Sequence, residues 1–153
     1  MVSVVLLLVE ASAGTPARTP GVWDRELVGA WEADIGSARW AIVRRSDHTF
    51  SEIRLEIRDY SVKKTTRVTA SGTWSIRGKS YVKRYHQGSD ASGKTVTQRD
   101  RSATIVRVAS DVFDYHESDG PLVRERRLGG EDMNLQKIAP RNLRRPFADY
   151  VPQ

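Results

Sequence analysis

Between residues 23 and 130 the sequence is a series of short runs rich in Val, Ile, Thr, Tyr, Phe and Trp, separated by Gly, Ser and Asp. Runs of this length and spacing are typical of antiparallel strands joined by tight turns, and no long stretch keeps the period of a helix. The predicted fold class is therefore all-β. The predicted strands are residues 27–33, 39–45, 49–58, 62–76, 80–87, 95–109, 112–117 and 122–128.

About eight strands in a domain of this size can close into a small antiparallel up-and-down β-barrel, which leaves no strand edge exposed. A two-sheet β-sandwich produces nearly the same pattern and remains the alternative. Turns between strands are predicted where Gly, Ser and Asp cluster. The best clusters are residues 46–48, 77–79, 88–93 and 118–121.

Alternation within the runs predicts which face of each strand is buried. In the third run we expect the buried face to be the one that carries Ile53, Leu55 and Ile57. The opposite face, predicted to contact solvent, carries Glu52, Arg54, Glu56 and Arg58. In the fourth run the face predicted to be buried carries Val62, Val68, Ala70, Trp74 and Ile76.

The first residues have the character of a processed segment. Residues 1–9 form an apolar run, and residues 10–13 supply the small residues that a signal peptidase prefers. We interpret residues 1–13 as a signal peptide, with a buried first β-strand as the alternative. Residues 14–22, rich in Gly, Pro and Thr, are predicted to be a flexible linker. The protein is then expected to be exported, either periplasmic or secreted.

The charge and the composition of the chain limit the kinds of molecule that it is expected to bind. The chain has 25 Lys and Arg against 19 Asp and Glu. For an exported protein this favours anionic surfaces such as phospholipid head groups over nucleic acid. Residues 131–153 are predicted to be a basic C-terminal tail, either a solvated terminus or a surface-binding arm. The absence of cysteine excludes disulfides, thiol catalysis and cysteine-based metal sites.

Three short motifs carry a resemblance to a known family. Gly29 and Trp31 form a Gly-x-Trp opening, residues 46–50 read Ser-Asp-His-Thr-Phe, and residues 71–78 contain Gly-Thr-Trp. Together they resemble the lipocalin-like barrels, including short bacterial exported members, over a domain of residues 23–130. His48 stands where that family often has glycine, so a positive φ is predicted there.

The resemblance implies a closed barrel end and a ligand cavity. In the family, the tryptophan closes one end and an arginine from the last strand packs across its ring. Trp31 matches the tryptophan, and Arg124 or Arg126 is the expected partner. A small amphipathic or anionic ligand is then expected in the cavity of a non-enzymatic, monomeric protein. The alternative function is docking on an anionic membrane or a partner protein through the basic surface.

Candidate ligand-binding residues lie on the middle strands. Tyr81, Lys83 and Tyr85 share one face, which would suit a stacking platform for a glycan or a nucleic acid, or would simply line the barrel. Arg99, Arg101 and Arg107 share a face of the next run, pointing outward or converging on an anion. The residues expected at the ligand are Trp74, Tyr81, Lys83, Tyr85, Arg99 and Arg101.

Local motifs for catalysis and for cofactors are missing from the sequence. His48, His86 and His116 have no metal-ligand spacing. There is no Gly-x-Ser-x-Gly elbow, no Gly-x-Gly-x-x-Gly and no phosphate loop. We therefore expect no metal and no cofactor, and the expected export argues against a nucleic-acid partner.

Overall fold

The structure, a computed structural model, describes residues 21–59, 64–118 and 120–129. The predicted signal peptide, most of the predicted linker and the predicted basic tail lie outside these ranges. One short helix, α1 (Val22–Leu27), precedes the strands. The strands are β1 (Gly29–Asp34), β2 (Ala38–Arg44), β3 (Thr49–Asp59), β4 (Lys64–Arg77), β5 (Ser80–Asp90), β6 (Arg101–Val108), β7 (Val112–Glu117) and β8 (Leu122–Arg127).

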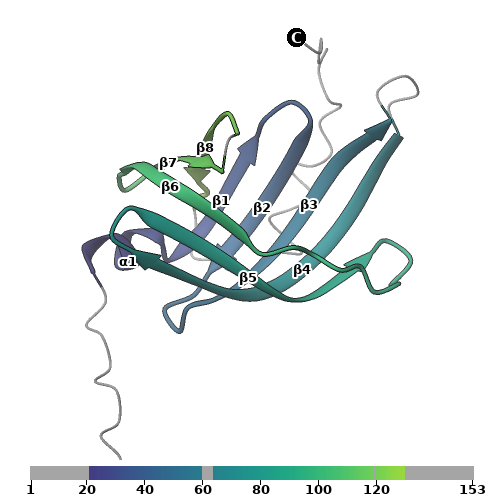
Figure 1. Cartoon of the computed structure of the whole chain (residues 1–153), viewed down its shortest axis with the longest axis horizontal. Coiled ribbons are helices and arrows are strands. Elements are labelled where there is room, and N and C mark those ends of the chain that lie inside the picture. The colour runs from purple at the N-terminus through teal and green to yellow at the C-terminus, as the bar shows by residue number, and fades with distance from the viewer. Residues whose placement is uncertain (1–20, 60–63, 119, 130–153) are drawn as a thin grey trace, which may run out of the picture.

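The strands form one closed antiparallel barrel in the order β1 to β8 (Figure 1). Each strand pairs with its neighbour in sequence, and β8 returns to pair with β1. This confirms the all-β class and the up-and-down barrel, and it excludes the sandwich. No helix within the described ranges has the length and apolar character needed to cross a membrane.

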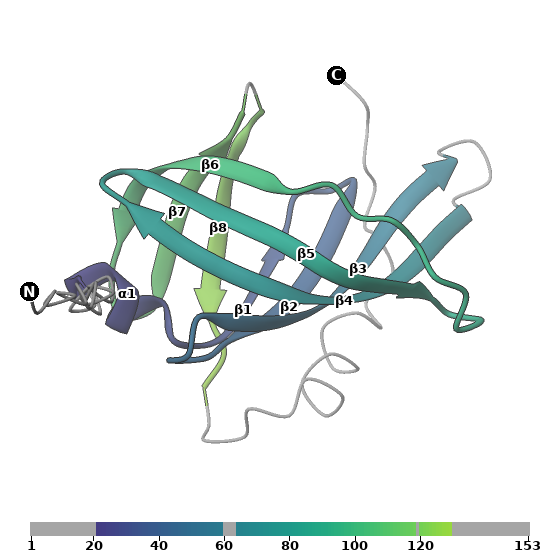
Figure 2. The ribbon, with the colours of Figure 1, turned by 60° about the horizontal axis from the view of Figure 1, so that its bottom comes forward.

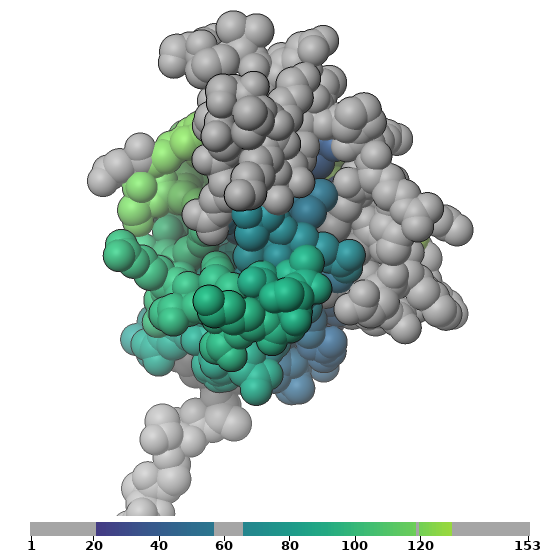
Figure 3. Space-filling model, turned by 90° about the vertical axis from the view of Figure 1, so that its right-hand side faces the viewer, coloured from purple at the N-terminus to yellow at the C-terminus, as the bar shows by residue number. Residues whose placement is uncertain are grey.

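Helix α1 lies at one end of the barrel, which we call the capped end (Figure 2). The β2–β3, β4–β5 and β6–β7 turns are at this end because the strands run up and down. The opposite end, called the far end, carries the β1–β2, β5–β6 and β7–β8 connections. Figure 3 looks at the molecule from the far-end side, with β5 and the residues after it in green at the front.

The helix was not predicted, and it shifts the first strand. Asp24 accepts a hydrogen bond of 2.7 Å from the backbone N–H of Gly21, which satisfies one of the free donors at the start of the helix. Leu27 is fully buried as the last residue of α1, so β1 begins two residues later than predicted. Val22, predicted to end the linker, is instead the first residue of the helix.

The sixth strand is shorter than predicted. Residues 95–100 precede β6, and only Thr95 forms an isolated bridge, to Ser89. Asp100 instead accepts a hydrogen bond of 3.0 Å from the backbone N–H of Tyr85. A register shift between Ile105 and Arg107 then reverses the alternation within β6. The common face predicted for Arg99, Arg101 and Arg107 is therefore wrong.

The turn at residues 46–48 is confirmed. His48 has φ of 63°, the positive value predicted for this position. Asp47 stabilises the turn because its carboxylate accepts hydrogen bonds from the backbone N–H and the hydroxyl of Thr49, at 2.9 and 2.7 Å. The His48 ring stacks on Trp74 of β4 at a centroid distance of 4.7 Å.

The burial prediction for β3 is confirmed at Ile53 but wrong at Glu52 and Arg54, whereas that for β4 holds at the residues whose side chains are described. Glu52 and Arg54 point into the barrel and are 2% and 4% exposed. They pair with Ala70 and Val68 of β4, which share the inner face with Trp74. Polar side chains are tolerated inside because they pair with one another.

The face of β3 that was expected to line the core points outward, and Ile53 on that face is buried as well. Ile53 is 0% exposed and packs in a cluster on the outer face of β1, β2 and β3. We call this cluster the outer apolar patch. Its members are Ala30, Ala41, Val43 and Ile53.

Candidate functional site

The capped end is closed by Trp31 and Arg127. Trp31 is fully buried and donates a hydrogen bond of 3.0 Å from its ring nitrogen to the carbonyl of Leu27. The guanidinium of Arg127, one residue beyond the predicted candidates, lies over the Trp31 ring. The prediction of Arg124 or Arg126 is therefore wrong. Both are exposed on the outer face of β8, because side chains alternate along a strand.

Arg127 also joins the helix to the barrel. Its guanidinium donates to the carbonyls of Val28, at 2.8 Å, and of Glu26 and Ser110. Gly29 leaves the space for this side chain, since a Cβ at that position would lie 2.5 Å from Nη1 of Arg127. Gly29 also has φ of 133°, which a residue with a side chain rarely adopts. The glycine of the Gly-x-Trp pattern is thus explained by the space that Arg127 needs and by the positive φ at this position.

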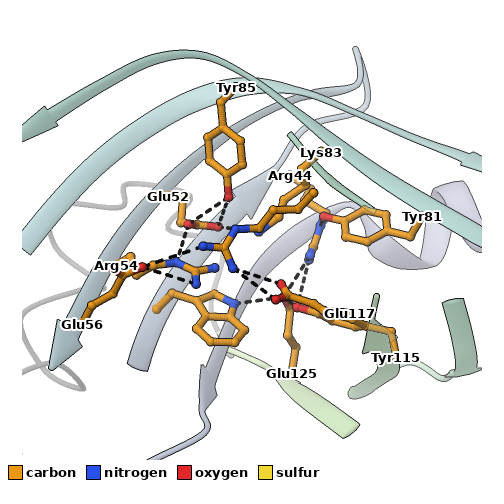
Figure 4. A network of polar contacts seen from close by, with 12 residues as sticks. Arg44, Glu52, Arg54, Glu56, Tyr81, Lys83, Tyr85, Tyr115, Glu117 and Glu125 are labelled. Atoms are coloured by element: carbon orange, nitrogen blue, oxygen red, sulfur yellow. Dashed lines mark hydrogen bonds and ion pairs between the residues drawn. The ribbon is translucent and has the colours of Figure 1, made fainter. Parts of the chain in front are cut away.

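The centre of the barrel contains a buried ion pair. Arg44 of β2 and Glu125 of β8 are both 0% exposed, and Nη1 of Arg44 lies 2.8 Å from Oε2 of Glu125. Trp40 and Tyr115 each donate a hydrogen bond of 3.0 Å to Oε1 of Glu125, while Tyr81 accepts one of 2.9 Å from Arg44 (Figure 4). Each charge therefore has both an opposite charge and a polar neighbour, as a buried ion pair requires.

A second group lies beside it on β3 and β5. Glu52 accepts a hydrogen bond of 2.7 Å from Lys83 and one of 3.0 Å from Arg54. The Tyr85 hydroxyl points at the same carboxylate and donates to it at 3.3 Å (Figure 4). The guanidinium carbon of Arg54 lies 4.5 Å from the centre of the Trp40 ring, a cation–π contact.

Toward the far end the network reaches solvent. Arg101 of β6 pairs with Glu117 of β7 at 3.1 Å and lies 3.8 Å from Glu56 of β3. Their side chains are 30%, 26% and 23% exposed, respectively. The cations Arg44, Arg54, Lys83 and Arg101 are thus matched in number by the carboxylates Glu52, Glu56, Glu117 and Glu125. The interior network is close to electrically neutral.

Burial and charge pairing in the network shift the pKa values of Glu52, Glu125 and Tyr81. Burial raises the pKa of Glu52, but Lys83 and Arg54 outweigh burial and hold that pKa well below its usual range. The pKa of Glu125 is lowered in the same way, because Arg44 outweighs the effect of burial. Burial raises the pKa of Tyr81 to about 12. All these groups therefore keep their neutral-pH charge states inside the barrel.

Among the described residues, a donor of Arg54 in the network lacks a hydrogen-bond partner. Nη2 of Arg54 is buried and makes no hydrogen bond to any described residue, although Nε of the same guanidinium donates to Glu52. A buried donor on a charged group without an acceptor is costly, because the group has left water without compensation. The Arg54 side chain is 5% exposed and lies 3.8 Å from Glu56, so the free donor is close to the far end of the network.

The predicted ligand-site residues divide into two groups. Five lie inside the barrel: Trp74, Tyr81, Lys83, Tyr85 and Arg101. Trp74 is at the capped end, where its ring nitrogen donates to the carbonyl of Thr49 at 3.2 Å. Tyr81 and Lys83 are 1% exposed within the network, whereas Tyr85 and Arg101 lie toward the far end. Arg99 is exposed outside the barrel and joins none of them.

Sequence reasoning missed the acidic half of the site and two of its arginines. These residues are Arg44, Glu52, Arg54, Glu56, Glu117 and Glu125. The signal that could have found them is strict alternation. Glu52 and Arg54 share a face with Phe50, and Glu125 shares one with Val123, so each charged run contains an apolar residue that marks the inner face.

A second feature is a hollow of about 1030 Å³ beside β3, β4 and β5. The register places Ser51, Ser71 and Gln87 in one outward row that lines it, and Thr69 with Ser89 in the next. The lining within the described residues contains hydroxyl and amide groups and no carboxylate. This hollow shares Tyr85 with the interior network, but none of the network's charged residues.

The described residues contain no group of three or more His, Asp or Glu side chains placed to hold a metal ion. No protein-family model matches the chain, and no curated protein is similar enough to count as a match.

Proposed function

We propose that the protein is an exported, lipocalin-like, non-enzymatic binding protein that takes a small anionic or amphipathic ligand at the far end of its barrel. The observation that carries this proposal is the unpartnered Nη2 of Arg54, a buried cationic donor next to side chains that solvent reaches. A carboxylate or another anionic oxygen is the strongest acceptor for such a donor.

The surroundings of Arg54 fit an amphipathic molecule. Trp40 lies against one face of the guanidinium, and the Tyr85 ring packs edge-on against Phe50 at a centroid distance of 5.2 Å. Arg101 supplies a second cation at the far end. An acidic group would bind among Arg54 and Arg101, while an apolar portion would contact the Tyr85 ring. Because the network itself is close to neutral, one added anion is not repelled by excess negative charge.

Tryptophan fluorescence tests this proposal, because Trp40 touches Arg54. The titrants are octanoate, inorganic phosphate and, as an uncharged analogue, octanol. We expect octanoate to change the emission with saturation and octanol to bind at least tenfold more weakly, since it lacks the charge. A Trp40→Phe variant identifies which part of the signal comes from the site.

A matched pair of variants separates the far end from the rest of the surface. Arg101→Gln should weaken octanoate binding several-fold, whereas Arg99→Gln, which removes the same charge outside the barrel, should leave it unchanged. The proposal is overturned if octanoate and phosphate both give neither heat in calorimetry nor a Trp40-dependent change in emission. Equal effects of the two substitutions would place the ligand elsewhere.

Export is part of the same proposal and has its own test. The apolar start and the small residues at 10–13 support cleavage after Ala13. The intact mass of protein isolated from the exported fraction should correspond to a chain that begins at Gly14. A mass that includes Met1 would show that the first residues are retained.

A second candidate function is docking on an anionic membrane, and a patch on β6 and β8 favours it. Val106 and Leu122 are 57% and 46% exposed, and the exposed Arg126 shares the outer face of β8 with Leu122, while Arg124 on the same face pairs with Asp114 at 2.8 Å. Apolar and cationic side chains together suit an anionic lipid surface.

Vesicle sedimentation tests the second function. Binding to vesicles that contain phosphatidylglycerol should weaken with added salt, because the attraction of Arg126 to the lipid head groups is screened. A Leu122→Ser, Arg126→Gln double variant should lose most of this binding, while Arg84→Gln, on the outer face of β5, serves as the control. Equal binding to uncharged phosphatidylcholine vesicles would contradict this function.

A further inference from the structure

The outer apolar patch is buried although it lies outside the barrel. Ala41, Val43 and Ile53 are each 0% exposed, and Ala30 is 5% exposed. Their strand neighbours Ile42 and Glu52 point inward, so the patch side chains point away from the interior. Outward-facing residues of a single-layer barrel reach 0% exposure only when another part of the protein covers them.

The described residues supply part of this cover. Leu128, the first residue after β8, is the one partly buried hydrophobic residue of the described ranges that packs against the patch. Its backbone N–H donates a hydrogen bond of 2.8 Å to the carbonyl of Ala30. The chain therefore leaves the barrel at the edge of the patch, with residues 130–153 still to follow.

The sequence after this exit point suits an apolar surface. Residues 130–153 contain apolar side chains distributed over their length, and the most apolar are Met133, Leu135, Ile138, Leu143, Phe147 and Val151. Neighbouring strands lie about 4.8 Å apart, so crossing from β1 to β3 covers about 10 Å. A few residues at about 3.3 Å each cover that distance.

We propose that residues 130–153 of the same chain bind across the outer face of β1, β2 and β3 and cover the outer apolar patch. The exit of the chain at Leu128 selects this segment over a second copy, because the attachment holds it at the patch at a high effective concentration. The segment is then a second layer of the barrel wall, and its basic residues are held beside the barrel instead of forming a free arm.

A spin-label experiment on the full chain tests this placement. The protein has no cysteine, so Asn142→Cys creates a single site for a nitroxide. We expect amide signals of Ala41, Val43 and Ile53 to broaden strongly, and those of β6 and β7 to stay sharp. The same label at Ala91→Cys, in the exposed β5–β6 connection, is the control and should leave the patch unaffected.

Two outcomes would overturn the proposal. Uniform, weak broadening over the whole barrel would show a segment that does not bind the patch. Broadening that appears only when isotope-labelled chains are mixed with separately spin-labelled chains would show that another copy supplies the cover.

Thermal unfolding gives a second measurement that does not depend on labels. Ile53→Ala and Phe147→Ala should each lower the melting temperature by several degrees, and their combined effect should be smaller than the sum if both residues belong to one packed interface. Phe147→Ala combined with Ala103→Gly, which is inside the barrel, should be additive. Strict additivity of Ile53→Ala with each of Leu143→Ala and Phe147→Ala would argue against the interface.

Discussion

Arg127 and Trp31 face each other across the pairing of β1 and β8, with the guanidinium carbon 4.3 Å from the centre of the indole ring. The contact joins the first strand to the last at the point where the barrel closes. It also holds α1, because Arg127 donates to carbonyls at the end of that helix. The cap and the closure of the barrel therefore depend on the same side chain.

Gly29→Ala should destabilise the protein by more than the cost of backbone strain alone, which is about 1–3 kcal/mol. The new Cβ would lie 2.5 Å from Nη1 of Arg127 and force that side chain off the Trp31 ring. Gly78→Ala is the control, because Gly78 also has a positive φ, of 58°, and a Cβ added there would meet no atom within 4 Å. Urea denaturation should show a larger loss for Gly29→Ala; equal losses would mean that the space for Arg127 is unimportant.

Arg127→Met should lower the free energy of unfolding by about 2 kcal/mol, through loss of the cation–π contact and of the hydrogen bonds to carbonyls. Arg126→Met, at the exposed neighbouring position, should leave stability close to that of the unaltered protein. The near-ultraviolet circular dichroism of Trp31 should change only in the first variant. If Arg126→Met lowered the stability more than Arg127→Met, Arg126 would be the arginine that stabilises this end of the barrel.

Glu125→Gln should cost about 3–5 kcal/mol, because it leaves the charge of Arg44 buried without its counter-ion. Glu117→Gln removes a carboxylate that is 26% exposed, and solvent screening should limit its cost to less than about 1 kcal/mol. Adding Arg44→Met to Glu125→Gln should recover part of the loss. Chemical denaturation of the three variants measures this, and no recovery in the double variant would contradict the ion-pair interpretation.

Acid should destabilise the barrel through Glu52 and Glu125. Their pKa values are lowered in the folded protein from the usual 4.5, so they stabilise the fold above that pH. The stabilisation is lost as the pH falls below 4.5 toward the lower folded values. Urea midpoints measured between about pH 7 and about pH 3 should fall with acid. The fall should be shallower in Glu52→Gln, and an identical slope would show that Glu52 does not contribute.

Alkali should destabilise the fold through buried tyrosines. Burial raises the pKa of Tyr81 from 10.0 to about 12 and raises those of Tyr85 and Tyr115 as well. A group whose pKa is raised on folding stabilises the fold at pH values below its unfolded pKa. For Tyr81 this stabilisation is lost as the pH rises from 10.0 toward about 12. Tyrosinate absorbance should show a late-titrating group that Tyr81→Phe removes. Titration of every tyrosine near 10.0 in the folded protein would contradict the burial.

The sequence predicted where the strands lie, but it predicted only in part which side of each strand faces the barrel interior. Turn residues and β-branched runs located the strands, since both signals are local. For β3, however, alternation shows only which residues share a face. Ile53 and Glu52 are both buried, on opposite sides of the sheet, so hydrophobicity chose the wrong face as the inner one.

The residues of the candidate site could also be predicted only in part. Tyr85 was singled out because aromatic and basic residues alternate on its strand, and Arg101 because of its parity with Arg99 and Arg107, which β6 does not keep. Arg127 was missed by one position, since the pairing of β8 with β1 is a contact between distant parts of the sequence. Arg44 and Glu125 are also far apart in the sequence, and no feature of the residues around either one indicates which residue it pairs with.

The pairing of β1 with β8 covers only Trp31 with Arg127 and Glu32 with Arg126. It is also the pairing most distant in sequence, since the Val28–Arg127 hydrogen bond spans 99 positions. Contacts this far apart carry the largest loop-closure entropy, so we expect the ring of strands to be completed last during folding. Until then β1 and β8 are both open edges that can pair with another chain, and slow closure in an Arg127 variant would appear as concentration-dependent aggregation on refolding.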